Sequence, residues 1–95
     1  MIKKIGIGLN IWNGEKTIIN TLKSLINQTY YNIEIIILDN RSTDQTAQKI
    51  KNFIKRNKKK KKKIKIELII DKKKEIFLIR KNFSYKNIYI NLNTA

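Results

Sequence analysis

The order of apolar and polar positions predicts three strands in the N-terminal part of the chain. Residues 35–38 are an unbroken run of Ile and Leu. The run is too short for a helix and is typical of a strand buried on both faces of a parallel sheet. Residues 2–9 alternate loosely between apolar and polar side chains, and residues 64–70 alternate before they become wholly apolar. Both segments are predicted to be strands.

Two amphipathic helices are predicted between these strands. Apolar residues recur at helical spacing at Ile18, Ile19, Leu22, Leu25 and Ile26 within residues 15–27, and at Ala47, Ile50, Phe53 and Ile54 in a segment that ends near Asn57. Ser42 and Gln45 form a capping-box pattern, which predicts that the second helix begins immediately after the central turn. The order β-α-β-α-β with right-handed crossovers predicts an α/β fold with a Rossmann-like parallel sheet.

Residues 72–95 have no clear pattern. Ile88, Ile90 and Leu92 alternate with polar residues, as in an exposed edge strand. However, 17 of these 24 residues are Lys, Asn, Ile, Tyr or Phe, which AT-rich DNA encodes in almost any reading frame. The tail is therefore unassigned, and two hypotheses stay open: an edge strand, or a segment translated partly out of frame.

Polar residues follow the first two predicted strands at their carboxyl ends. Asp39 and Asn40 end the central strand, and residues 10–14 form the turn after the first. Ligands of open α/β sheets bind outside the carboxyl ends of the strands, and parallel neighbours bring these two turns to one edge. Trp12 and Asp39 could therefore face the same ligand. An ordinary turn also favours Asp and Asn, so this pattern alone leaves a purely structural role open.

Composition restricts the chemistry that is available. The chain has no Cys and no His, which excludes disulfides and the usual transition-metal ligands. No apolar run approaches the ~20 residues of a membrane span, and no signal peptide is recognisable. We therefore expect a cytoplasmic protein without a transmembrane segment. The sequence contains no signal for the oligomeric state.

The net charge of +15 suggests a polyanionic partner. Yet residues 49–65 hold 11 of the 22 Lys and Arg, whereas residues 1–48 carry five basic and four acidic groups. Within the basic segment, the Lys-rich stretch of residues 57–63 contains no aromatic side chain on which a base could stack. A solvated loop is favoured over a phosphate-tracking or membrane-surface patch, and no specific nucleic acid is expected as a partner.

Several motifs of the chain together resemble the start of the family 2 glycosyltransferases. They are Trp12-Asn13-Gly14-Glu15, Ser24-Leu25 with Asn27-Gln28-Thr29, Glu34, and Asp39-Asn40 with Ser42-Thr43-Asp44. The resemblance covers residues 2 to about 48 and continues more weakly to Asp71. It implies that residues 1–71 are the nucleotide-sugar-binding half of an incomplete GT-A fold.

The resemblance also implies roles for individual residues. Trp12 would cover the base of a UDP-sugar or similar donor, and Asp39 would accept a hydrogen bond from an imino N–H of that base. Both roles suit the residue types, since a flat base packs well on an aromatic ring and a carboxylate is a strong acceptor. Asn13, Glu15 and Asn40 would hold the two turns in place.

Other parts of the family pattern are missing from the chain. A complete relative would be expected to use Mg²⁺ or Mn²⁺ held by an Asp-x-Asp motif, with a catalytic carboxylate further on. After Asp71 this sequence has one acidic residue, Glu75. We therefore expect no metal site and no catalytic residue here, and interpret the chain as an inactive glycosyltransferase fragment. Two alternatives are a non-catalytic nucleotide-binding module and, less favoured, a basic nucleic-acid-binding protein.

Overall fold

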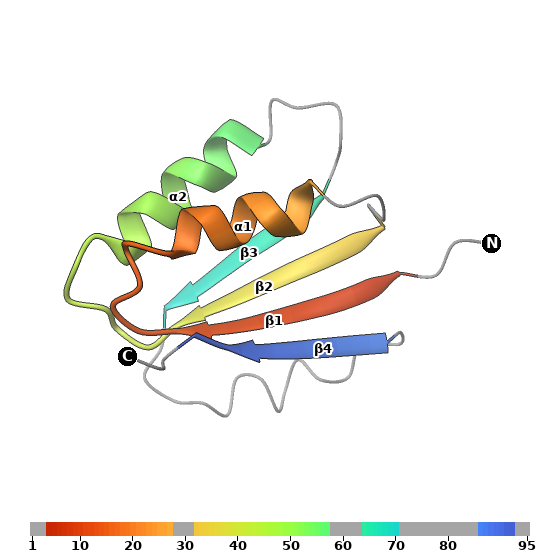
Figure 1. Cartoon of the computed structure of the whole chain (residues 1–95), viewed down its shortest axis with the longest axis horizontal. Helices are drawn as coiled ribbons and strands as arrows, with labels where there is room; N and C mark the ends of the chain where they lie inside the picture. The colour runs from red at the N-terminus through yellow and green to blue at the C-terminus, as the bar shows by residue number, and fades with distance from the viewer. Residues whose placement is uncertain (1–3, 28–31, 58–63, 71–85, 93–95) are drawn as a thin grey trace.

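Parallel strands in the order β3-β2-β1-β4 form the sheet of this computed structural model (Figure 1). The structure describes residues 4–27, 32–57, 64–70 and 86–92. Within these residues the strands are β1 (Ile5–Ile11), β2 (Ile33–Asp39), β3 (Lys65–Ile70) and β4 (Lys86–Asn91). Every pair of neighbouring strands is parallel. The predicted α/β class with a Rossmann-like parallel sheet is therefore confirmed.

β2 lies in the interior of the sheet, as its unbroken apolar sequence predicted. All seven of its residues are buried. It pairs with β1 from Ile5 opposite Ile33, and with β3 from Glu34 opposite Lys65. The Lys65 ammonium lies 3.2 Å from a carboxylate oxygen of Glu34, whose side chain is mostly buried. This ion pair joins the amino ends of β2 and β3.

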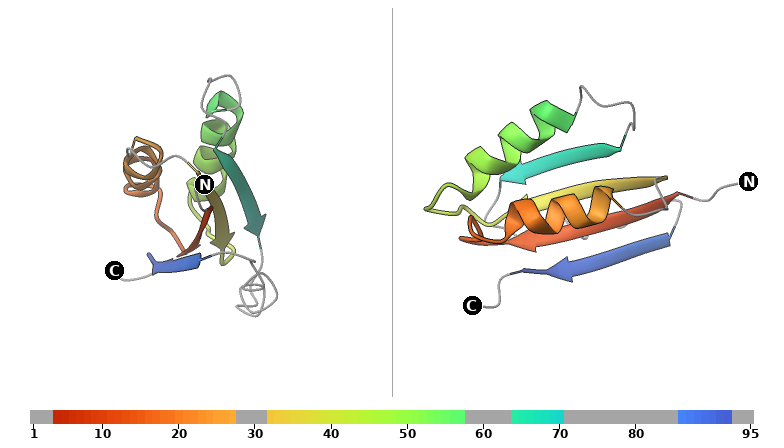
Figure 2. Two further views of the ribbon diagram at one scale, coloured as in Figure 1. Left: turned by 90° about the vertical axis from the view of Figure 1, so that its right-hand side faces the viewer. Right: turned by 45° about the horizontal axis from the view of Figure 1, so that its top comes forward.

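Two helices cover one face of the sheet (Figures 1 and 2). Helix α1 spans Ile18–Ile26 and α2 spans Thr46–Asn57. α1 begins later than the predicted residue 15, because the Gly14 carbonyl accepts hydrogen bonds from both Thr17 N–H and Ile18 N–H and so forms a turn before the first helical residue. No helix in the described part of the chain is long and apolar enough to cross a membrane.

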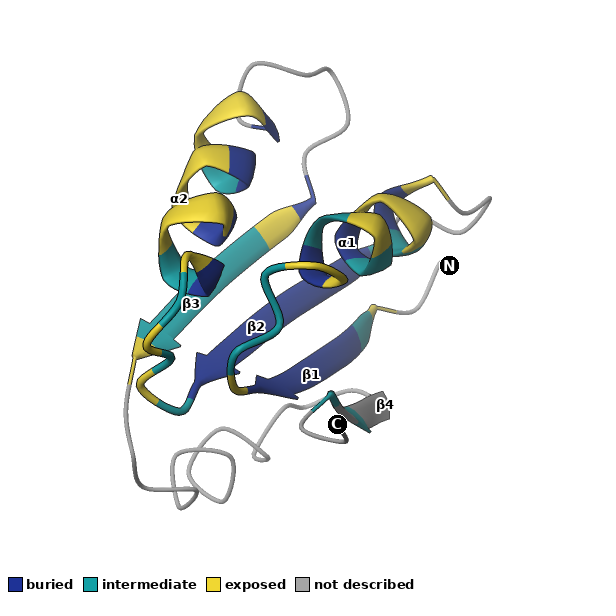
Figure 3. Ribbon diagram, turned by 60° about the vertical axis from the view of Figure 1, so that its left-hand side comes forward, coloured by how far each residue is buried: buried dark blue, intermediate teal, exposed yellow. Residues whose placement is uncertain are grey.

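The core lies between the helices and the alternate residues of β1 and β2 that face them (Figure 3). The fully enclosed side chains include Leu9 and Ile11 of β1, Ile35 and Ile37 of β2, Ile18 and Leu22 of α1, and Ile50 of α2. Each such side chain contributes about 1.5–3 kcal/mol relative to an exposed one. The helices are thereby fixed against the strands whose ends carry the polar turns.

β4 lies at the edge of the sheet beside β1, with Ile88 opposite Ile7. Ile90 is partly buried against the core. The rest of the unassigned tail, residues 72–85 and 93–95, lies outside the described residues, as do Asp71 and the lysines at 58–63. β1 thus has β2, the next strand in sequence, on one side and β4, the last described strand, on the other. Such a reversal of strand order marks the usual ligand crevice of an open α/β sheet, at the carboxyl end of β1.

Candidate functional site

The polar loops after β1 and β2 meet at the carboxyl edge of the sheet, which we call the carboxyl rim (residues 10–15 and 39–46). Parallel pairing of β1 with β2 predicts this meeting, and hydrogen bonds between the loops confirm it. Ser42 Oγ accepts a hydrogen bond from Asn13 N–H at 2.8 Å. Gly14 N–H donates to Thr46 Oγ1 at 2.9 Å. The two loops therefore form one hydrogen-bonded unit.

The Asn13 side chain is the main connection between them. Its Oδ1 accepts hydrogen bonds from the N–H of Thr43 at 2.8 Å and of Asp44 at 3.3 Å, and its Nδ2 donates to Thr43 Oγ1 at 3.2 Å. The Asn13 backbone has φ of 50°, in the left-handed region that Asn tolerates better than most residues. Both the side chain and the backbone conformation therefore suit Asn at this position.

Asp39 presents one bonded and one unbonded carboxylate oxygen. The residue is 1% exposed. Its Oδ1 accepts hydrogen bonds from Ser42 N–H at 3.0 Å and from Ser42 Oγ at 2.5 Å. Its Oδ2 is buried and has no hydrogen-bond partner in the described part of the chain. A buried unsatisfied acceptor is rare and costs free energy, so this oxygen calls for a donor that the described protein groups do not supply.

The predicted capping role of Ser42 is wrong. Ser42 closes the turn on Asp39, and α2 begins only at Thr46. Asp44 satisfies the start of the helix instead, since its Oδ1 accepts hydrogen bonds from Thr46 N–H at 2.9 Å and Thr46 Oγ1 at 2.5 Å. Its Oδ2 accepts from Glu15 N–H at 3.3 Å. The first helical turn and the loop after β1 therefore share one carboxylate.

These hydrogen bonds set the charge state of Asp44. Burial raises the pKa of this carboxyl, but hydrogen bonds from Thr46 and from the backbone N–H of Glu15 outweigh burial and hold the pKa below its ordinary value. Asp44 is therefore ionised at neutral pH, which suits a carboxylate beside the positive end of a helix dipole.

Asn40 continues the strand beyond Asp39 and contacts β1. Its N–H donates to the Ile11 carbonyl at 2.9 Å, and its Nδ2 donates to Oδ1 of Asn10. Asn40 Oδ1 is buried and, within the described residues, has no partner. The Asn10 carbonyl accepts a hydrogen bond from Leu92 N–H, next to β4, at 2.7 Å. The two asparagines therefore join β2, β1 and the end of β4 at the crevice.

Asn10 is a site residue that the sequence analysis missed. It was placed in the turn, whereas β1 continues to Ile11 and Asn10 is buried within the strand. A polar residue inside an otherwise apolar strand is the signal that could have identified it.

Trp12 and Glu15 occupy different surroundings. The Trp12 side chain is among the exposed large hydrophobic groups, with half of its surface accessible. Glu15 is turned toward α2, where Lys49 Nζ donates to its carbonyl at 3.1 Å and lies 4.0 Å from its carboxylate. Of the five predicted site residues, Asn13, Asp39 and Asn40 thus join the network at the rim by their side chains, Glu15 joins it by its backbone N–H, and Trp12 lies on the surface of the loop.

The rim therefore offers an exposed aromatic ring and two buried oxygens, Asp39 Oδ2 and Asn40 Oδ1, to which no described group donates a hydrogen bond. This combination suits a ligand with a flat ring and N–H or O–H donors. Among the described residues, no three acidic side chains lie close enough together to hold a metal ion.

Two known proteins are similar to this chain. The chain is 34% identical over 50 residues to "Putative glycosyltransferase EpsE" of Bacillus subtilis (strain 168), a match that covers 53% of this chain and 18% of EpsE. The crystal structure of S. aureus TarS 1–349 superposes with a TM-score of 0.64 at 23% identity, over 93% of this chain and 27% of TarS. The TarS likeness shows the fold, and the chain spans less than a third of either protein.

The family model described as Glycosyl transferase family 2 matches residues 7–82. This match begins within β1, includes both loops of the carboxyl rim and extends beyond Asp71, where the motif resemblance ended. Because it spans most of the sequence, this chain belongs to glycosyl transferase family 2.

Proposed function

We propose that the carboxyl rim binds the nucleotide of a nucleotide-sugar donor, and that the chain is the donor-binding part of an enzyme that transfers the sugar to an acceptor. Membership of the family supports the class of donor. The observation that carries the proposal is the Asp39 carboxylate, in which Ser42 holds Oδ1 and leaves buried Oδ2 without a described donor.

The geometry of Asp39 favours a base with an imino N–H. A carboxylate oxygen can only accept hydrogen bonds, so Oδ2 would receive the N3–H of uracil in a charge-assisted hydrogen bond. Such a bond contributes about 1.5–3 kcal/mol. Cytosine has an unprotonated N3 acceptor at the same ring position and would face the carboxylate with no proton between them. UDP should therefore bind more tightly than CDP.

Trp12 would cover one face of the base, whereas Asp39 would bind its edge. Its half-exposed ring lies directly after β1, at the crevice where strand order reverses. Stacking of a base on an aromatic side chain contributes about 1–3 kcal/mol. Asn13 and Asn40 would act by holding the loops that carry Trp12 and Asp39, through their bonds to Thr43 and Asn10.

Calorimetric titration of the full chain with UDP and CDP tests the role of Asp39. In Asp39→Asn the amide can still accept from Ser42 but places N–H groups where Oδ2 was. We expect the UDP affinity to fall by about 10- to 100-fold, matching the loss of a charged hydrogen bond, while the CDP affinity does not fall, because the new N–H groups can donate to N3 of cytosine. Circular dichroism confirms that the variant is folded. An equal loss for both nucleotides, or an unchanged affinity for UDP, would contradict the assignment.

Fluorescence tests the role of Trp12, the single tryptophan of the chain. UDP should change its emission, and Trp12→Phe should retain more affinity than Trp12→Ala because a ring remains for stacking. Equal affinities for these two variants would mean that Trp12 does not contact the base.

Repeating the UDP titration with Mn²⁺ tests whether the whole chain also supplies metal ligands. A gain in UDP affinity with Mn²⁺ would require such ligands.

A further inference from the structure

A groove runs between α1 and α2 on the side of the molecule that carries the helices. It consists of two hollows of about 340 Å³ each, which share Arg56 of α2. Lys23, Ile26, Phe53 and Arg56 line the first, together with two asparagines. Lys16 and Lys49 line the second, which reaches toward Glu15. We call these two hollows the interhelical groove.

The charge of the groove is strongly positive. Among the described residues that line it, Lys16, Lys23, Lys49 and Arg56 are basic and Glu15 alone is acidic. Glu15 lies near Lys49, which neutralises it. Lys23 and Arg56 are both exposed, and their side chains form no hydrogen bond or ion pair with any described residue. Two cations from different helices therefore line the same hollow without a described counter-ion.

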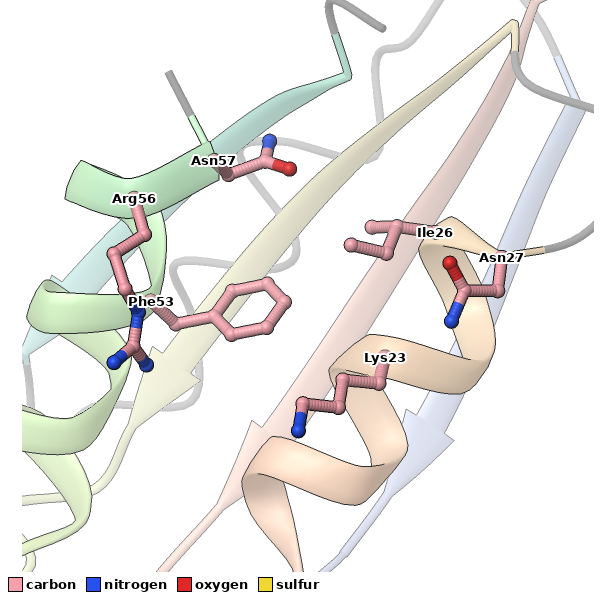
Figure 4. A pocket seen from close by; sticks show the side chains of 6 residues that line it. All are labelled: Lys23, Ile26, Asn27, Phe53, Arg56 and Asn57. Carbon is pink, nitrogen blue, oxygen red and sulfur yellow. The ribbon is translucent and has the colours of Figure 1, made fainter. Parts of the chain in front are cut away.

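Figure 4 shows how the first hollow is built. The Phe53 ring extends from α2 toward α1, and Ile26 extends from α1 toward α2. Both residues are 6% exposed, so they form an apolar floor. Lys23 extends from α1 toward α2 beside this floor, and Arg56 runs alongside α2 next to Phe53, so both line the hollow. An apolar floor keeps water from part of the hollow, which strengthens the interaction of both cations with any anion placed between them.

Cations at these positions also have a simpler role. Lys23 lies in the last turn of α1, and Lys55 and Arg56 lie in the last turn of α2. Basic residues there stabilise a helix by about 0.3–1 kcal/mol each through the helix dipole. Lys55 has that role equally, yet it does not line either hollow. Lys55 is therefore a matched control for Arg56.

We propose that Lys23 and Arg56 bind a phosphate-bearing anion in the interhelical groove. A phosphate monoester carries close to two negative charges at neutral pH, which matches two unpaired cations. The planar guanidinium of Arg56 can bind two of its oxygens together, while Lys23 supplies a point charge from the other helix. The phosphate belongs either to a small phosphorylated molecule or to a lipid headgroup. The site lies in the first hollow, which shares no lining residue with the carboxyl rim, and it does not depend on the nucleotide-binding proposal.

Titration with inorganic phosphate and with pyrophosphate tests the site directly. We expect Arg56→Gln and Lys23→Gln to weaken binding at least about 10-fold, as the loss of one charge-assisted bond implies. Lys55→Gln, which removes one charge from the same turn, should weaken it less than about 2-fold. Equal losses for Lys55→Gln and Arg56→Gln would mean that binding follows net charge alone and would overturn the proposal.

Amide chemical shifts locate the anion. Phosphate should shift the amide signals of residues around Lys23 and Arg56, and leave those of residues 42–44 at the rim unchanged. Shifts confined to the rim would overturn the proposal.

Co-sedimentation with phosphatidylcholine vesicles, with and without phosphatidic acid, distinguishes the two sources of the phosphate. Binding to the acidic vesicles that Arg56→Gln abolishes identifies a lipid headgroup, and binding of free phosphate alone identifies a small molecule. Binding of neither would refute the site.

Discussion

The Asn13 carboxamide and the backbone N–H of Thr43 are joined by a 2.8 Å hydrogen bond between residues thirty positions apart. This bond links the loops of two neighbouring strands at their carboxyl ends. A ligand that contacts both loops therefore meets groups whose separation is fixed before it binds. Such preorganisation reduces the entropy that binding would otherwise cost.

Asn13→Ala should lower the free energy of unfolding by about 2 kcal/mol. Part of the loss comes from the bonds to Thr43 and Asp44, and about 1 kcal/mol or more comes from placing Ala at positive φ. Asn13→Gly loses the same bonds but adopts the conformation freely, so it should be more stable than Asn13→Ala by about 1 kcal/mol. Urea denaturation measures both. Equal stabilities would show that the backbone conformation contributes nothing.

Gly14 is required because of its contact with Ile11. A Cβ atom at Gly14 would lie 2.4 Å from Ile11 Cδ1 and 2.8 Å from Cγ1. Ile11 is fully buried and cannot move aside freely. Gly14→Ala should therefore destabilise the protein by about 1–3 kcal/mol, the usual range for overpacking.

Ile11→Val provides the test of this cause, because it deletes the Cδ1 atom of the closest contact. Ile→Val alone costs about 0.5–1.5 kcal/mol. The variant that combines Gly14→Ala with Ile11→Val should lose less free energy of unfolding than the two single variants together, by about 1 kcal/mol. Such a difference is expected for residues in contact. Additive costs in thermal or urea denaturation would attribute the need for glycine to another contact.

Arg41 is the second residue with positive φ, at 59°, and it has neither the short side chain nor the turn preference of Asn. A residue with a Cβ atom pays roughly 1–2 kcal/mol in this region. Arg41→Gly should be more stable than Arg41→Ala by about 1 kcal/mol, since both variants lack the long side chain and differ in the freedom of the backbone. If Arg41→Ala proved the more stable in urea, the loop would have to adopt a different conformation in solution.

The elements that the sequence predicted correctly were those specified by apolar periodicity. The Ile-rich run of β2 could be buried only in the middle of a parallel sheet, and α2 ended at Asn57 as its apolar spacing required. Right-handed crossover then brought Asp39 and the loop with Asn13 to one edge without any knowledge of tertiary contacts. Burial and chain connectivity leave very few possible arrangements of these strands and helices.

The hydrogen-bond partners at the rim could not be predicted in the same way. From the sequence, the Ser42 hydroxyl has two possible partners, the N–H groups of the following helix and the Asp39 carboxylate. The structure shows the bond to Asp39, but the sequence pattern is the same in both cases. Thr46 is completely buried and accepts the hydrogen bond of Gly14 N–H, although nothing in its sequence position distinguishes it from an ordinary helical residue. The hydrogen-bond partners of these side chains depend on the distances between the two loops. Those distances are set only when the strands have paired.

The stability of the rim should depend on pH through Asp44. Its pKa in the folded protein is below the ordinary value of 3.8, because the hydrogen bonds from Thr46 and Glu15 favour the ionised form more than burial opposes it. A carboxyl with a depressed folded pKa binds protons more readily in the unfolded state. Its contribution to stability is therefore complete above the unfolded pKa and disappears as the pH falls through the lower, folded pKa.

Asp44→Asn isolates this contribution from that of the other carboxyl groups. At neutral pH the variant should be less stable than the parent protein, because an amide is a weaker acceptor for Thr46 and Glu15 than a carboxylate. As the pH falls below 3.8 the parent carboxyl becomes protonated and resembles the amide in shape and charge. The difference in urea midpoint between the two proteins should therefore be largest above the ordinary pKa of 3.8 and shrink steadily as the pH falls below it. A difference that stays constant over this range would mean that Asp44 acts through its shape alone.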